Sequence, residues 1–266
     1  MAVRWMDVES LSFNTLLLLE RIQLSWFPGW VCEADLALAL DANPVVEWYL
    51  GHKCPEIRPW LDGVAARKRP AGADEVRAAE TAVMRQINDL LVYVVDPAVY
   101  DAQPFLGWDS RELTKRVAFA GKTVVDVGSG TGRLALVAAP EAAVVFAVEP
   151  VETLRRTIRD KAAARGLSNV YAVDGTIEAI PFPDEFADVV MGGHVFGEVP
   201  EVEIAEVERV TRRGGTMIAC PGNGDADNET HAAFVRHGFQ WERFDEPQDG
   251  TKRKYWAIKG SAMGER

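Results

Sequence analysis

A carboxylate followed by three glycines at alternate positions is the part of this sequence best suited to bind a ligand. The segment Asp126-Val127-Gly128-Ser129-Gly130-Thr131-Gly132 follows a β-rich apolar run and precedes an apolar helical pattern. Glycines allow a tight turn and let a ligand approach the backbone without a Cβ in the way. The segment therefore predicts a binding loop between a strand and a helix, with Gly128, Ser129 and Gly130 against the ligand and Asp126 beside it.

The spacing of the glycines separates two classes of nucleotide ligand. A dinucleotide-binding fold carries the pattern G-x-G-x-x-G, whereas the last position of that pattern is Arg133 here. NAD brings a pyrophosphate, which the carboxylate of Asp126 would repel. S-adenosylmethionine brings an ammonium and a sulfonium, which Asp126 would attract. The loop therefore favours S-adenosylmethionine over NAD.

Further ligand-binding candidates follow the next three expected strands. Glu149 lies in Val148-Glu149-Pro150, where a carboxylate can accept both hydroxyls of a ribose. Asp174 begins Asp174-Gly175 and can accept from an adenine amino group. The fourth strand ends in Met191-Gly192-Gly193-His194, where small residues leave room for a ligand. Open α/β sheets bind ligands at the carboxyl ends of their strands, so we expect these segments to meet in one crevice.

Short apolar runs alternate with helical patterns from about residue 111 to the end of the chain. The expected strands span 123–127, 143–148, 170–173, 187–191, 216–219, 239–244 and 255–258. The expected helices span 132–139, 151–166, 202–211 and 229–237. Continuous apolar runs between helices predict a mostly parallel sheet covered on both faces. The last two runs lack a full helix between them, which predicts an antiparallel pair at one edge.

Residues 1–110 show helical patterns and no clear strand signal. Helices are expected over 11–24, 35–50 and 74–95, the last one ending at Asp96-Pro97. Most of the eight tryptophans fall here: Trp5, Trp26, Trp30, Trp48, Trp60 and Trp108. Such a concentration indicates either a packed helical core or a pocket for an apolar or aromatic ligand.

Composition limits the partners and the location that we expect. The formal net charge of -11 and the pI of about 4.9 disfavour nucleic acid and anionic membranes as partners. Three scattered cysteines indicate a reducing compartment. The leucine run 16–19 is far shorter than the roughly 20 apolar residues of a membrane span. We therefore expect a cytoplasmic protein.

Taken in order, these motifs resemble those of the class I S-adenosylmethionine-dependent methyltransferases, closest to the ubiquinone/menaquinone-biosynthesis branch (methyltransferase type 11). The matching segments are 126–132, 148–150, 174–184, 186–200 and 213–216, so the resemblance covers about residues 110–260. It implies a Rossmann-like fold: a seven-stranded, mostly parallel sheet whose last strand is antiparallel. The chain then divides into a methyltransferase domain over 111–266 and an N-terminal helical cap over 1–110.

The resemblance also assigns roles to individual residues. Gly128 and Gly130 would approach the methionine part of the cofactor, with the backbone of Thr176 and Ile177 along the adenine edge and residues 191–192 at the sulfonium. The full set of expected cofactor-binding residues is Asp126, Gly128, Ser129, Gly130, Glu149, Pro150, Asp174, Gly175, Thr176, Ile177, Met191 and Gly192.

A catalytic group is harder to assign from the sequence. His194 can serve as a general base toward the acceptor, or it can simply line the cofactor pocket. Many relatives have Leu-Glu-His after the fourth strand, where this chain has Val195-Phe196-Gly197-Glu198. Glu198 is a second candidate base, or the solvated start of a helix. His52, Cys32 and Cys54 lack paired ligand spacing, so no metal is expected.

These inferences combine into one hypothesis. The chain is expected to transfer a methyl group from S-adenosylmethionine to a small-molecule acceptor that the N-terminal cap recognises, and a homodimer is left open. Two alternatives stay open as well: a non-catalytic cofactor-binding or regulatory protein, and a methyltransferase acting on a protein side chain. The sequence does not specify whether the acceptor atom is O, N, C or S.

Overall fold

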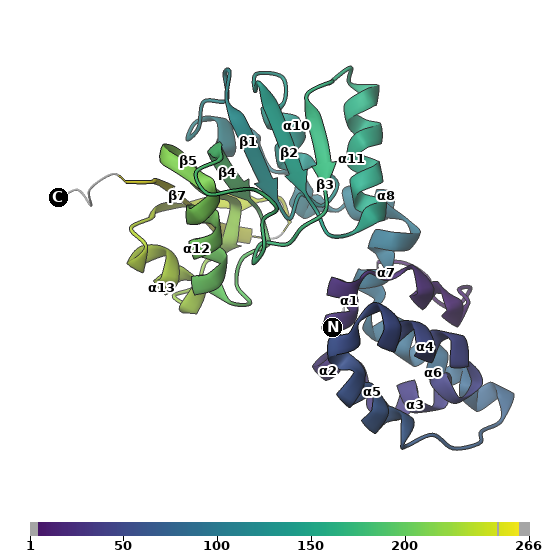
Figure 1. Ribbon diagram of the computed structural model, residues 1–266. Coiled ribbons are helices and arrows are strands. Elements are labelled where there is room, and N and C mark those ends of the chain that lie inside the picture. The colour runs from purple at the N-terminus through teal and green to yellow at the C-terminus, as the bar shows by residue number, and fades with distance from the viewer. Residues whose placement is uncertain (1–4, 249, 261–266) are drawn as a thin grey trace. The chain divides into compact units, whose positions relative to one another are not determined.

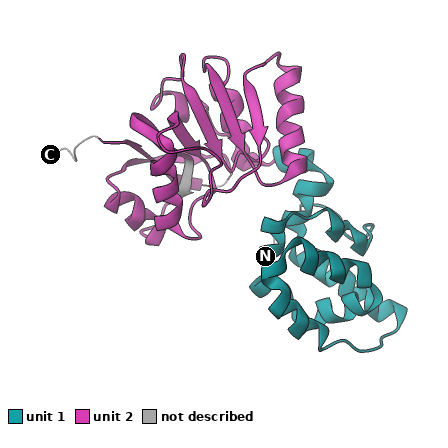
Figure 2. Ribbon diagram, viewed as in Figure 1, with its two compact units in different colours: residues 1–101 teal, residues 102–266 magenta. Residues whose placement is uncertain are grey.

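A computed structural model describes residues 5–248 and 250–260 of the chain (Figure 1). It divides into two compact units, Met1–Asp101 and Ala102–Arg266 (Figure 2). This division precedes the boundary expected near residue 110. The reason is that Trp108 and Leu113 are both buried in the core of the second unit, so the segment after residue 101 packs with the sheet-containing unit.

The first unit consists of short helices. Their bounds are η1 (Phe13–Leu18), α1 (Arg21–Ser25), α2 (Phe27–Trp30), α3 (Glu33–Ala42), α4 (Pro44–Lys53), η2 (Pro55–Ile57), α5 (Arg58–Ala65), α6 (Ala73–Gln86), α7 (Asn88–Val95) and α8 (Pro97–Asp101). The helix expected over 35–50 is interrupted before Pro44, which has no N–H to donate. The helix expected over 74–95 is interrupted at Ile87, whose φ of -110° and ψ of 25° are not helical.

The tryptophans do not form the packed core of the first unit. Trp30 and Trp48 are 47% and 60% exposed, and the other described tryptophans of this unit are half-buried. Aliphatic side chains and phenylalanine make up the core instead, among them Phe13, Leu40 and Val83, which are at most 1% exposed. The indole rings therefore lie at the rim of the helical unit rather than at its centre.

The second unit is built on a seven-stranded sheet (Figure 1). Its strands are β1 (Thr123–Val127), β2 (Val144–Val148), β3 (Val170–Val173), β4 (Ala187–Gly192), β5 (Thr211–Gly224), β6 (Gln240–Glu246) and β7 (Gly250–Ile258). The order is β3-β2-β1-β4-β5-β7-β6, and β7 runs antiparallel to both of its neighbours. The expected Rossmann-like, mostly parallel sheet with an antiparallel last strand is thus confirmed.

Both faces of this sheet are covered. The remaining elements are η3 (Pro104–Gly107), α9 (Arg111–Thr114), α10 (Arg133–Ala138), α11 (Glu152–Ala164), α12 (Pro200–Val210) and α13 (Glu229–Arg236). Val124 of β1 packs on one face with residues of α10 and α11. Its neighbour Val125 packs on the other face with residues of α12 and α13. Successive side chains of a strand point to opposite faces, so burial on both faces explains the continuous apolar runs.

Among the described residues, no helix is both long and apolar enough to cross a membrane.

Strand register brings the candidate loops together. Val127, the last residue of β1, pairs with Val148 at the end of β2 and with Gly192 at the end of β4. Val148 in turn pairs with Val173 at the end of β3. Four parallel strands therefore end level with one another, and the segments that follow them leave the same edge of the sheet.

Candidate functional site

The loop between β1 and α10 requires its glycines. Gly128, Gly130 and Gly132 have φ values of 63°, 54° and 86°, in the left-handed region that residues with a Cβ rarely adopt. A Cβ on Gly128 would lie 2.5 Å from Cγ2 of Val195, and one on Gly132 would lie 3.1 Å from Cγ1 of Ile158. The backbone conformation therefore accounts for all three glycines, and close packing adds a second reason at Gly128 and Gly132.

Asp126 is a buried carboxylate at the base of this loop. Its side chain is fully buried, and its Oδ2 accepts a hydrogen bond of 3.0 Å from the backbone N–H of Ala135. Its Oδ1 is buried and has no hydrogen-bond partner among the described residues. Burial, with a smaller contribution from the negative charge of Glu149, raises the pKa of Asp126 to about 7. A cationic group would satisfy this carboxylate and favour its ionised form.

Glu149 ties the end of β2 to the glycine loop. Its Oε2 accepts from the N–H of Gly130 at 2.9 Å, and its Oε1 accepts from the N–H of Val151 at 3.0 Å. Each carboxylate oxygen has a second lone pair, so both can also accept a hydroxyl. Burial raises the pKa of Glu149 to about 7 against the lowering effect of these two backbone bonds. The half-buried Pro150 follows it and leads into α11.

Arg155 on α11 connects the ends of β2 and β3. Its Nη1 donates to the backbone carbonyl of Glu149 at 2.6 Å and to Oδ1 of Asp174 at 2.9 Å. The Asp174 side chain is 76% exposed, whereas that of Arg155 is 13% exposed. The arginine therefore fixes the direction of an otherwise exposed carboxylate. Arg155 could not be recognised from the sequence, because a charge on an amphipathic helix gives no signal that distinguishes it from its neighbours.

The segment after β3 makes a tight turn. A Cβ on Gly175 would lie 2.7 Å from Cδ of Pro181 and 2.8 Å from Cγ1 of Val148. Thr176 forms an isolated antiparallel bridge with Ala179, and Ile177 is 5% exposed. The backbone at 175–177 is thus held close to the end of β2, with the Ile177 side chain turned into the core.

The end of β4 leaves no room for larger residues. Met191 is 1% exposed. A Cβ on Gly192 would lie 3.0 Å from the carbonyl oxygen of Val127 and 3.0 Å from Cγ1 of Val195. Since Val195 also packs against Gly128, the segment after β4 lies directly against the glycine loop.

His194, in that same segment, is paired with a glutamate that is distant from it in the sequence. Its Nε2 lies 3.0 Å from Oε1 of Glu246, the last residue of β6. The ring of Phe105 contacts the imidazole edge-on, with a centroid distance of 5.6 Å. His194 has a φ of 54°, which is uncommon for a residue with a Cβ. No local pattern links residues 194 and 246, so only the folded chain reveals this pair.

Glu198 is not placed like a reacting group. It is exposed and lies just before α12. This position agrees with the alternative that Glu198 is the solvated start of a helix. Its backbone N–H donates to Oε1 of Glu203 at 2.9 Å, and Oε1 also accepts from Val199 while Oε2 accepts from Gly197. The fully buried Glu203 therefore holds the 197–199 turn beside the candidate site. This role was also missed, because it depends on backbone groups rather than on side-chain types.

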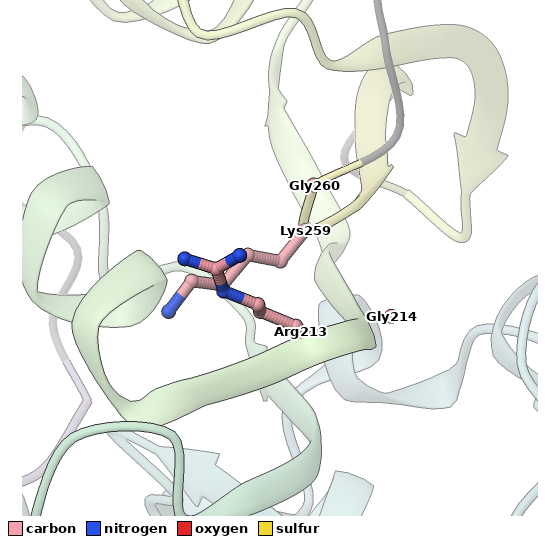
Figure 3. A pocket seen from close by; sticks show the side chains of 4 residues that line it. All are labelled: Arg213, Gly214, Lys259 and Gly260. Atoms are coloured by element: carbon pink, nitrogen blue, oxygen red, sulfur yellow. The ribbon is translucent and has the colours of Figure 1, made fainter.

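The described pocket lies at the other end of the sheet. Arg213, Gly214, Lys259 and Gly260 line a pocket of about 470 Å³ (Figure 3). Thr211 at the start of β5 pairs with Ala187 at the start of β4, so this pocket borders the amino ends of those strands. It is separate from the glycine loop.

Within the described part of the chain, no group of three or more His, Cys, Asp or Glu is arranged to hold a metal ion.

Comparison with known proteins points to one family of domains. Residues 125–219 match the family model described as "Methyltransferase domain". The uncharacterized methyltransferase YcgJ of Bacillus subtilis is 30% identical over 98 residues, covering 36% of this chain and 38% of that protein. The demethylmenaquinone methyltransferase of Geobacillus kaustophilus is 32% identical over 121 residues, covering 43% and 51%. The chain thus spans about half or less of the length of these relatives.

A solved structure supports the fold. A chain of the complex between the Haloferax volcanii Trm112 methyltransferase activator and a methyltransferase superposes with a TM-score of 0.52. The match covers 65% of this chain and 96% of that one, at 15% sequence identity. At this identity the similarity concerns the arrangement of strands and helices alone.

Proposed function

We propose that this chain, whose C-terminal unit is a class I S-adenosylmethionine-dependent methyltransferase domain, transfers a methyl group from S-adenosylmethionine to a small-molecule acceptor. The observation that carries the proposal is the buried Oδ1 of Asp126, which has no partner among the described residues and lies at the base of a left-handed glycine loop. An uncompensated buried carboxylate is costly, and a cationic ligand would remove that cost.

The surrounding residues fit such a ligand. Asp126 would attract its ammonium, and Glu149 would accept the ribose hydroxyls with the lone pairs that its backbone hydrogen bonds leave free. Asp174, directed by Arg155, would accept from the adenine amino group. The tight turn at 175–177 would present backbone atoms to the adenine ring, and the close-packed end of β4 would border the sulfonium.

The chemistry divides between the ligand and the chain. When bound, S-adenosylmethionine supplies an electrophilic methyl group on a positively charged sulfur. The chain has to hold that methyl in line with the acceptor atom, exclude competing water, and accept a proton where the acceptor carries one. The demethylmenaquinone methyltransferase relative supports a small molecule as the acceptor.

The first unit would form a cap that recognises the acceptor. The proposal is that residues 1–101, together with the linking segment up to about residue 110, select the acceptor while the second unit holds the cofactor. Its support is that every cofactor-binding candidate lies beyond residue 110, whereas the exposed indoles of Trp30 and Trp48 belong to the first unit. Exposed aromatic side chains are common anchors for apolar ligands.

A cytoplasmic location and the absence of a nucleic-acid partner belong to the same proposal. The net charge of -11 and the small number of cysteines support both. Light scattering would test whether the chain forms a homodimer.

Product formation tests the proposed function. The purified chain would be incubated with S-adenosylmethionine and a pool of small metabolites, and S-adenosylhomocysteine would be quantified by mass spectrometry. The proposal expects acceptor-dependent formation of this product. Cofactor binding without turnover on any small molecule would instead favour a non-catalytic binding protein, and turnover only with added protein would favour side-chain methylation.

A further inference from the structure

The pairing of His194 with Glu246 joins two distant parts of the chain at the carboxyl edge of the sheet. His194 follows β4, and Glu246 ends β6. Because β7 is antiparallel to both β5 and β6, β6 runs in the same direction as β4 and β5. Both residues therefore leave the edge at which the glycine loop lies, and Nε2 of His194 approaches Oε1 of Glu246 to 3.0 Å.

Burial of Glu246 makes this contact more than a surface ion pair. The side chain of Glu246 is 0% exposed, whereas that of His194 is 31% exposed. The second oxygen of Glu246, Oε2, is buried without a hydrogen-bond partner among the described residues. A buried carboxylate with one partner is strongly biased toward keeping it, so Glu246 fixes both the position of the imidazole and the tautomer that it adopts.

The imidazole keeps one nitrogen available. Donation of Nε2–H to the Glu246 carboxylate leaves Nδ1 as an acceptor, and in the described part of the chain Nδ1 has no hydrogen-bond partner. His237 provides a contrast, because its two ring nitrogens both lie near carboxylates, Nδ1 at 3.0 Å from Glu208 and Nε2 at 2.8 Å from Glu201. Of these two histidines, only His194 combines a buried orienting carboxylate with a free ring nitrogen.

We propose that His194 is the general base of the methyl transfer and that Glu246 is its positioning residue, so that the acceptor belongs to the class of hydroxyl, phenol or amine compounds that lose a proton. This inference rests on the proposed methyltransferase function. Nδ1 of His194 takes the proton from the acceptor X–H group. The electron pair of X forms the bond to the methyl carbon, and the pair of the breaking carbon–sulfur bond stays on sulfur.

Charge is conserved in this step. The positive charge that leaves sulfur appears on the imidazolium, directly beside the Glu246 carboxylate. The partly exposed His194 side chain can then release the proton to solvent. Glu246 contributes by holding Nε2–H throughout, as an orienting carboxylate does for a histidine base in other enzymes. The Phe105 ring restricts the imidazole from a second direction.

A first test requires no acceptor. The full-length chain, with its four histidines labelled with ¹⁵N, would be examined by long-range ¹H–¹⁵N correlation spectra at a pH where His194 is neutral. The inference expects the tautomer with a proton on Nε2 and none on Nδ1. A neutral His194 that carries its proton on Nδ1 would overturn it, because no basic nitrogen would then face the acceptor.

A second test measures turnover of the acceptor that the wild-type chain methylates best. The variants are His194→Asn, chosen because asparagine tolerates a positive φ, and Glu246→Gln. General-base catalysis contributes roughly 10²- to 10⁴-fold, so His194→Asn should lower kcat by that factor. Glu246→Gln should lower kcat by about tenfold or more, with KM changed by less than about twofold in both. Glu208→Gln is the matched control, since it alters the other histidine–glutamate pair and should leave kcat unchanged.

Acceptor acidity provides a readout that a purely structural role would not move. An analogue of the acceptor that is already ionised at the assay pH needs no base. His194→Asn should therefore methylate such an analogue at most of the wild-type rate. Equal losses for both acceptors, or wild-type kcat in His194→Asn, would overturn the base assignment. Calorimetry separates failure of the base assignment from failure of the proposed function. Both variants should bind S-adenosylmethionine like the wild type. A wild-type chain that does not bind S-adenosylmethionine would refute both proposals.

Discussion

Replacing Glu149 by glutamine is the substitution whose consequences the structure defines best. The wild-type carboxylate accepts from the N–H groups of Gly130 and Val151, and the proposal adds two ribose hydroxyls. Glutamine has the same shape, but only its amide oxygen accepts hydrogen bonds. Its NH₂ group therefore replaces an acceptor, and either a backbone N–H or a ribose hydroxyl loses its hydrogen bond.

The expected loss of cofactor affinity follows from the number of hydrogen-bond acceptors lost. Hydrogen bonds to charged groups contribute about 1.5–3 kcal/mol. Losing one such interaction with the ribose lowers affinity by roughly ten- to a hundredfold. One buried N–H left without an acceptor should also destabilise the chain by about 1–3 kcal/mol, because Glu149 connects β2 to the glycine loop.

Calorimetry and thermal denaturation separate these two effects. Glu149→Gln should bind S-adenosylmethionine ten- to a hundredfold more weakly at a temperature well below its melting transition. Glu141→Gln is the control, because Glu141 is exposed and lies in the turn before β2, at the strand end opposite Glu149. If Glu149→Gln keeps wild-type affinity while retaining its fold, Glu149 does not accept the ribose hydroxyls and the assignment fails.

Further predictions concern the glycine loop, the two buried carboxylates beside it, and two tryptophans of the first unit. Gly130→Val should abolish S-adenosylmethionine binding, because a branched residue is strained at a φ of 54° and its side chain would occupy the ligand's space; wild-type affinity in calorimetry would contradict this. The pKa values near 7 of Asp126 and Glu149 predict that affinity for the cationic ligand rises as pH increases from about 6 to 8, and Asp126→Asn should reduce that rise. Their raised pKa values have the opposite consequence for the unliganded chain, which binds more protons folded than unfolded between about pH 4 and 7, so its stability to urea should fall as pH rises through that window. Trp30→Ala and Trp48→Ala should raise KM for the acceptor several-fold and leave S-adenosylmethionine affinity unchanged, if the first unit selects the acceptor; unchanged kinetics in both variants would argue against the cap.

The sheet could be predicted from the sequence because its strands are buried on both faces. Val124 and Val125 point to opposite faces and are both fully buried, which is what a continuous apolar run indicates. The glycine loop was also predictable, since left-handed positions such as Gly128 and Gly132 restrict the residue type. These features depend on residues that are close together along the chain, so the local sequence pattern predicts them.

Helix boundaries in the first unit were less predictable. The apolar spacing over 74–95 continues through the break at Ile87, because residues on both sides of it face the core. The break places the side chain of Asn88 where its Oδ1 accepts from the N–H groups of Trp5 and Met6. Those partners are more than eighty residues away in sequence, so the periodicity could not reveal them.

The residues that position the site were not predictable for a similar reason. Arg155, Glu203 and Glu246 act on groups brought to them by the fold, and their charges resemble those of ordinary surface residues in the sequence. Glu246 is the clearest case, since it ends a strand that was expected only to form a sheet edge. The sequence therefore predicts candidates for ligand contacts, but not the side chains that hold them in place.

Binding of S-adenosylmethionine in comparison with NAD is the measurement that tests the central claim most directly. Isothermal titration calorimetry on the full-length chain, at a pH above the pKa values of about 7 for Asp126 and Glu149, would give both dissociation constants. We expect saturable one-to-one binding of S-adenosylmethionine and no measurable heat from NAD. Tighter binding of NAD than of S-adenosylmethionine would contradict the assignment of the glycine loop and its carboxylates to a cationic methyl donor.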